Sequence, residues 1–173
     1  MRRVNIVQGE QYVSNEPQLV ISTLLGSCVA VCLHDAEARI GGMNHFLLGE
    51  PAPGARVDED QQQRYGIHAM ELLINALMSR GASRARLRAR LYGGANIISG
   101  LGAIGSRNAA FAQRFMELEN IAVVASNLGG CRARKVEFMP YEGRVRSFEV
   151  NDVPIPAPPV PTPAPAGGDI ELF

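Results

Sequence analysis

Residues 19–33 read LVISTLLGSCVAVCL, which is two apolar, β-branched runs separated by the small-residue turn Gly26-Ser27-Cys28. Short apolar runs bounded by glycine are typical of buried strands. A third run of this kind extends from Ile40 to Leu48, after a turn at Asp35 to Glu37. The first recognisable elements are therefore three strands, and a cysteine stands at the junction of the first two.

Helical spacing follows further along the chain. Between Gln62 and Arg80 the apolar residues recur at intervals of three and four, and Gly81 stands where a helix C-terminal glycine belongs. A second helix is expected from Ser106, whose hydroxyl can cap it, to Leu118. Further strand-like runs occupy residues 121–125, 135–139 and 144–150, and the last two indicate a hairpin. The pattern predicts a domain that mixes helices with strands.

Composition and charge narrow the class of protein. The chain has 173 residues, the length of one ordinary domain, and 17 basic residues balance 17 acidic ones, which argues against a dedicated nucleic-acid binder. Polar residues follow Arg2 and Arg3, so no signal peptide or membrane span is visible, and we expect a cytoplasmic protein without membrane insertion.

The amino-acid composition of the sequence changes near its end. Prolines spread among small residues begin at Pro154, and such a segment cannot build a core. We therefore expect a folded domain over residues 1–150, a Pro/Ala-rich flexible linker over 151–168 and a short acidic and apolar terminal peptide over 169–173. For this peptide, a tethered docking role and a segment without a role are both open.

Cys28 is the thiol on which chemistry can be argued. A glycine-permitted turn between two strands can expose its sulfur and direct backbone N–H groups towards whatever the sulfur attacks. A thiol becomes a good nucleophile when a base removes its proton, and an imidazole is the usual base. His45 lies on the strand that follows and can pair beside the cysteine strand, so we predict Cys28 as nucleophile and His45 as base.

The other thiols and imidazoles have simpler interpretations. Three cysteines without a secretion signal do not suggest disulfides. Cys32 and Cys131 are expected to be small buried residues, and the two remaining histidines to be surface or capping residues. The four-residue step from Cys28 to Cys32, with no second cysteine pair, does not fit a structural zinc site, so we expect no metal.

The ordered set of motifs resembles the CheD family of chemoreceptor glutamine deamidases. The resemblance rests first on residues 23–33 and on Gly41-Gly42-Met43-Asn44-His45-Phe46. Further matches are Ala69-Met70, Tyr92-Gly93-Gly94-Ala95, Ile104-Gly105-Ser106-Arg107-Asn108, Leu128-Gly129-Gly130 and Arg134-Lys135-Val136. Together they cover the chain to about Val150.

The resemblance implies an α+β fold, in which mixed β-sheets pack as a sandwich with flanking helices, like the catalytic domains of deamidating bacterial toxins. It places the family's nucleophile on Cys28 and its base on His45. The family's third member, a threonine six positions before the cysteine, falls on Ser22, whose hydroxyl would orient the imidazole. Thr23 is adjacent, but on a strand it would face the other way.

The implied activity is hydrolysis of receptor glutamine side chains to glutamate through a thioester, a reaction that requires no cofactor. The implied partners are methyl-accepting chemotaxis receptors and a CheC-type phosphatase. Two other functions stay open on the residues alone: a cysteine hydrolase of another amide or ester, and a non-catalytic chemotaxis adaptor that binds the phosphatase.

Arginines alternate with apolar residues over 84–91, a period of two that predicts a strand with an arginine face. Such a face could dock acidic receptor helices. A solvated edge strand that discourages aggregation is the simpler interpretation. The four arginines of this segment are Arg84, Arg86, Arg88 and Arg90.

Overall fold

The computed structural model describes residues 1–48, 59–97 and 103–150. In the described residues the strands are β1 (Arg2–Asn5), β2 (Gln11–Ser14), β3 (Leu19–Leu25), β4 (Val29–Asp35), β5 (Ile40–Asn44), β6 (Arg88–Gly93), β7 (Ala122–Leu128), β8 (Arg134–Met139) and β9 (Arg144–Glu149). The helices are α1 (Glu59–Ser79), α2 (Ile104–Leu118) and the short 3-10 helix Arg84–Arg86.

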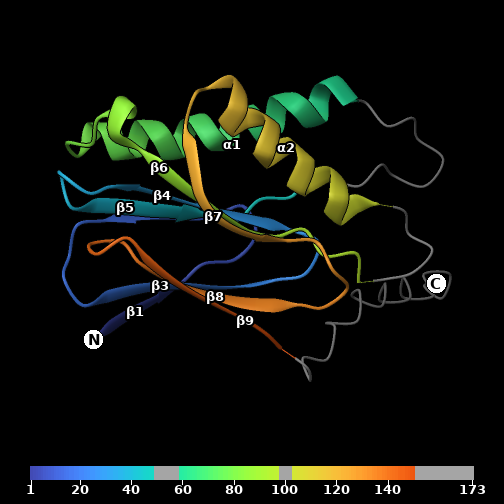
Figure 1. Ribbon diagram of the computed structural model, residues 1–173, viewed down its shortest axis with the longest axis horizontal. Helices are drawn as coiled ribbons and strands as arrows, with labels where there is room; N and C mark the ends of the chain where they lie inside the picture. The colour runs from blue at the N-terminus through green and yellow to red at the C-terminus, as the bar shows by residue number, and fades with distance from the viewer. Residues whose placement is uncertain (49–58, 98–102, 151–173) are drawn as a thin grey trace, which may run out of the picture.

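The strands form two sheets that pack face to face. One sheet has the order β1-β3-β8-β9 and the other the order β2-β5-β4-β6-β7. Both helices lie on the side of the five-stranded sheet that faces away from the four-stranded one (Figure 1). The strand pairs are antiparallel except β1 with β3 and β6 with β7. This confirms the α+β class, with mixed sheets in a sandwich and flanking helices; the likeness to deamidating toxins stays a prediction.

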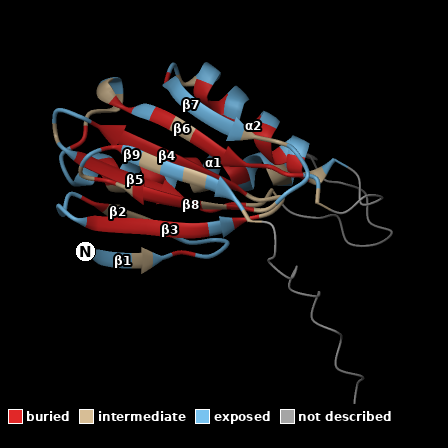
Figure 2. Ribbon diagram, turned by 60° about the horizontal axis from the view of Figure 1, so that its bottom comes forward, coloured by how far each residue is buried: buried red, intermediate tan, exposed pale blue. Residues whose placement is uncertain are grey.

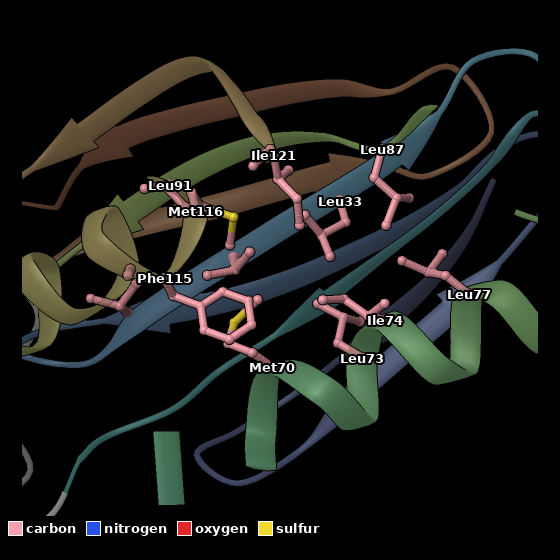
Figure 3. Packing of buried hydrophobic residues seen from close by; sticks show 14 of the residues in the cluster. Leu33, Met70, Leu73, Ile74, Leu77, Leu87, Leu91, Phe115, Met116 and Ile121 are labelled. Carbon is pink, nitrogen blue, oxygen red and sulfur yellow. The ribbon is translucent and has the colours of Figure 1, made fainter. Parts of the chain in front are cut away.

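The central strand β4 is buried on both faces, as Figure 2 shows by its red ribbon. Val29, Val31 and Leu33 point to the helix layer, where they join side chains of α1 and α2 (Figure 3). Ala30 and Cys32 point the other way, into the cluster between the two sheets. Burial on both faces explains why this strand reads as an unbroken apolar run.

The predicted arginine strand is wrong in two respects. Residues 84–86 form the 3-10 helix, and β6 begins only at Arg88. Moreover, β6 lies between β4 and β7, so it is not an edge strand. The first two arginines form ion pairs with acidic side chains. Arg84 pairs with Glu119, and Arg86 Nη2 lies 2.9 Å from Asp35 Oδ2. The four arginines therefore do not share one strand face or form a solvated edge strand, and a docking role for them stays a prediction.

Other expectations meet mixed outcomes. The helix before Gly81 is confirmed, and Gly81 has the left-handed φ of +105° that ends it. The hairpin of β8 and β9 is confirmed as well. Ser106 is not the cap of α2, because the capping position is Ala103. The linker and terminal peptide expected over 151–173 lie outside the described residues. In the described part of the chain, no helix is both long and apolar enough to cross a bilayer.

Candidate active site

The predicted nucleophile and base both belong to the face of the five-stranded sheet that looks towards the four-stranded one. Side chains alternate along a strand. Cys28 shares the side of Ala30 and packs against the cluster between the sheets, and His45 shares the side of Met43 in the same cluster. Two strands of one sheet thus direct the sulfur and the imidazole into the same space.

A single bridge brings the two segments together. Val29 N donates to Phe46 O at 3.0 Å, and Phe46 N donates back to Val29 O at 2.9 Å, in an antiparallel pair. Cys28 and His45 each precede one member of this pair, which makes them diagonal neighbours on one face. The Cα atoms of such neighbours are about 7–8 Å apart, within reach of long side chains. Cys28 is half-buried, whereas His45 is 6% exposed.

The imidazole of His45 is hydrogen-bonded to the side chain of Thr23. Thr23 Oγ1 lies 2.7 Å from His45 Nδ1 and donates to the carbonyl oxygen of Ile6, also at 2.7 Å. A hydroxyl has one proton, and the carbonyl can only accept. The oxygen of Thr23 must therefore accept a hydrogen bond from Nδ1–H, which leaves the lone pair of the imidazole on Nε2. This is the tautomer that a general base needs.

Ser22, predicted as the third member of the site, is not in contact with His45. Its hydroxyl donates to Asn5 Oδ1 at 3.2 Å on neighbouring β1. Thr23 shares the face of Ile21 and Leu25, both in the cluster between the sheets, so it is Thr23 that faces the imidazole. The alternation argument was sound, but it assigned the wrong residue to the inward face.

Burial lowers the pKa of His45 to about 4, and the nearby charge of Glu10 opposes this shift. The low pKa agrees with the hydrogen-bond pattern, because a neutral imidazole has one donor and one acceptor nitrogen. At neutral pH the side chain is thus uncharged and ready to accept a proton.

The backbone of the cysteine turn is fixed by the Gly93-Gly94-Ala95 segment. Gly94 N donates to Cys28 O at 2.8 Å, and Ala95 N donates to Gly26 O at 3.1 Å. A Cβ at position 93 would lie 2.2 Å from the Cys28 oxygen, and Gly93 has a φ of +107°. Glycine at this position is therefore required on two grounds, close approach and left-handed backbone.

Asn108 ties the cysteine turn to the histidine segment. Its Nδ2 donates to Ser27 O at 2.8 Å, and its Oδ1 accepts from Leu48 N at 3.1 Å. The side chain is 1% exposed and projects from α2. One buried amide thus holds the residue before the predicted nucleophile and a residue three positions after the predicted base. The sequence showed this asparagine within a motif but gave no role for it.

A tight turn near the N-terminus completes the surroundings of the thiol. Glu10 N donates to Val7 O at 3.0 Å, which closes a turn with Gln8 and Gly9 at its centre. The Cys28 sulfur donates to Gln8 Oε1 at 3.9 Å. Sequence reasoning missed this turn; its only signal is the glycine, since the flanking strands are just four residues long.

The remaining candidates are placed elsewhere. Cys32 is fully buried, and burial raises the pKa of its thiol far above the ordinary value. Cys131 was expected to be buried but is exposed. His34 Nε2 lies 3.2 Å from the Tyr141 carbonyl oxygen, and His68 is exposed on α1. Within the described residues, no group of three or more His, Cys, Asp or Glu side chains is arranged to hold a metal ion.

The tautomer argument predicts different outcomes for two substitutions at position 23. In Thr23→Val the Nδ1–H loses its buried acceptor, which costs about 1–3 kcal/mol and should lower kcat by roughly ten- to a hundredfold. Thr23→Ser keeps the hydroxyl and should stay within a few-fold of wild type. Steady-state ammonia release from a glutamine peptide measures both, and equal activity of the two variants would contradict the assigned role.

Asn108 offers a test that separates its two hydrogen bonds. Asn108→Asp keeps an acceptor for Leu48 N but replaces the donor to Ser27 O with an oxygen, whereas Asn108→Ala removes both bonds. Leaving buried polar groups unpaired costs about 1–3 kcal/mol each, so we expect both variants to unfold at lower urea concentration. Both should also lose kcat, because the turn and the base segment are no longer joined. Unchanged kcat in a variant that is clearly destabilised would show that the bridge does not align the site.

Comparisons with known proteins show which family the chain belongs to. A family model described as CheD chemotactic sensory transduction matches residues 47–148. A Zymomonas mobilis protein named as a probable chemoreceptor glutamine deamidase CheD is 48% identical over 99% of this chain and 93% of its own length. A protein of the same name from Caulobacter sp. strain K31 is 50% identical over 99% of this chain and 93% of its own. Among solved structures, the Neisseria meningitidis protein NMB0706 is 10% identical, with a TM-score of 0.48 over 76% of this chain and 64% of that one.

Proposed function

Since the chain belongs to the CheD chemotactic sensory transduction family, we propose that it hydrolyses glutamine side chains of chemoreceptors to glutamate. In this reaction Cys28 is the nucleophile, His45 the general base and Thr23 the residue that orients the imidazole. The observation that carries the proposal is the hydrogen-bond chain from Ile6 O through Thr23 Oγ1 to His45 Nδ1. This chain leaves Nε2 as the ring nitrogen that can accept a proton, and the bridge between Val29 and Phe46 joins the segments of Cys28 and His45.

The first half of the reaction forms a thioester. His45 Nε2 takes the thiol proton as the Cys28 sulfur attacks the carboxamide carbon of the substrate, and the carbonyl electron pair moves to oxygen. When the carbonyl re-forms, the C–N bond breaks, and the imidazolium gives its proton to the departing ammonia. In the second half, His45 removes a proton from water as the water oxygen attacks the thioester carbon. The C–S bond then breaks, the sulfur takes the proton back from the imidazolium, and the substrate leaves as glutamate.

Partial exposure of the thiol suits a macromolecular substrate. Cys28 is half-buried at a turn, while the imidazole behind it is shielded from water. A glutamine side chain on a receptor surface can reach such a sulfur. We further propose a CheC-type phosphatase as a second partner and the cytoplasm as the site of action, where receptor signalling segments would be met.

The test is mass spectrometry of receptor cytoplasmic fragments after incubation with the protein in heavy-oxygen water. We expect selected glutamines to become glutamates that carry solvent oxygen, with one ammonia released for each. Receptor binding without conversion would support the adaptor function instead. Conversion of small amides or esters, but not of receptor glutamines, would support a different cysteine hydrolase. Cross-linking of glutamine to an added amine in preference to hydrolysis would identify a transglutaminase-like enzyme.

A further inference from the structure

The turn that carries Gln8 is built rigidly onto the base. Gly9 has a φ of +88°, the value that the third position of a type II turn requires, and Gln8 takes the second position. Gly9 N donates to His45 O at 2.8 Å, and His45 N donates to Glu10 O at 3.1 Å. The Glu10 carboxylate also accepts from Val7 N at 3.1 Å. Gln8 is therefore presented to the site by a turn that is hydrogen-bonded to the backbone of His45.

The carboxamide of Gln8 can serve the thiol in two ways. While the sulfur carries its proton, Oε1 of Gln8 accepts from it at 3.9 Å. Once His45 removes that proton, the favourable partner is an N–H donor, and the same carboxamide carries two of them on Nε2. The terminal torsion of glutamine is broad and roughly two-fold, so a half-turn exchanges oxygen for nitrogen at little cost.

Other side-chain amides near the site are already committed. Asn108 bridges Ser27 and Leu48, as described above. Asn96 donates to Ser106 Oγ and accepts from Ser106 N. Asn44 accepts from Val31 N and points its Nδ2 to the Met70 sulfur. Among these amides of the described residues, it is Gln8 that contacts the Cys28 sulfur.

We propose that Gln8 is a catalytic residue, which donates a hydrogen bond from Nε2 to the substrate oxygen as that oxygen becomes negative. The inference rests on the proposed function, because it requires Cys28 to attack a carboxamide. When the C–S bond forms, the carbonyl electron pair moves to oxygen, and the Nε2–H of Gln8 stabilises that charge; when the C–N bond breaks, the pair returns and the hydrogen bond weakens. A side-chain amide in this position acts mainly on the transition state.

The test compares Gln8→Met with Gln11→Met. Methionine keeps the length of the side chain without an N–H donor. Removing one such donor typically lowers kcat by about 10²–10³, so we expect at least a hundredfold loss of kcat in Gln8→Met with KM nearly unchanged. The amide of Gln11 donates to Leu72 O at 3.3 Å, away from the thiol, so Gln11→Met should match wild type.

A second measurement separates charge stabilisation from thiol positioning. Alkylation of Cys28 by iodoacetamide uses the same sulfur but forms no oxyanion. Its rate in Gln8→Met should therefore change only through the lost contact with the sulfur, and by far less than kcat does. The exposed Cys131 is changed to alanine throughout, because it would react as well. Unchanged kcat in Gln8→Met would overturn the proposal, and so would equal losses in kcat and in alkylation rate. Deamidation that persists in Cys28→Ala would instead refute Cys28 as the nucleophile of the proposed reaction, which keeps the two failures distinct.

Discussion

The Cys28→Ala variant should lose deamidation altogether while it continues to bind receptor fragments. Without the sulfur no thioester forms, so the covalent route to glutamate is closed. In a protease triad, loss of the nucleophile costs roughly 10⁶-fold in kcat, and we expect a comparable fall, to the background rate. Ammonia release measures the activity, and the dissociation constant for a receptor fragment, measured by titration, should stay within a few-fold.

Cys131→Ala is the matched control, since this thiol is exposed and Cys28 is half-buried. It should deamidate at the wild-type rate. If Cys28→Ala retained a substantial rate, or if Cys131→Ala lost it, the nucleophile would have been misassigned. Cys32 is no substitute, because its burial holds the thiol in the protonated form.

The parts of the fold that sequence could predict are those where burial imposes a pattern. β4 reads as an apolar run because both of its faces are covered, and α1 reads as helical because only one of its faces is. The segment from Arg84 to Arg90 was wrongly predicted as one strand, because alternation alone does not distinguish a strand from a 3-10 turn followed by a strand. What decides there is the pairing of Arg86 with buried Asp35, which no local pattern reveals.

The site was predictable to the extent that its chemistry is carried by rare residue types. Cys28 and His45 follow from the need for a thiol and a base near one turn, and the structure brings their segments together. The third residue did not follow, because alternation tells that Ser22 and Thr23 face opposite ways but not which face is inward. That choice depends on the packing of Ile21 and Leu25 against the other sheet. The sequence did not indicate that Gln8 lies near Cys28, because its position depends on a turn between two short strands.

His45→Gln should lower kcat by about 10²–10⁴, the usual contribution of a general base. The wild-type protein should also show an unusual pH profile. Burial lowers the pKa of His45 to about 4, so the acidic limb of kcat/KM should fall near that pH rather than near 6.5. Ammonia release between pH 4 and pH 8 measures the profile. An acidic limb centred near 6.5 would mean that the imidazole is far better solvated than its 6% exposure implies.

The same shift makes His45 a source of acid sensitivity in folding. As the pH falls below 6.5, the unfolded chain gains a proton at this histidine, but the folded protein does not until about pH 4. The unfolded state then binds more protons, so stability declines as the pH falls through this window and is unaffected above it. At 1.36 kcal/mol per pKa unit the full difference is about 3 kcal/mol. Urea unfolding of His45→Gln should therefore show a shallower decline over this range than wild type. A residual slope is expected from His34, whose pKa is also lowered by burial, and an unchanged slope in His45→Gln would contradict a neutral, buried imidazole.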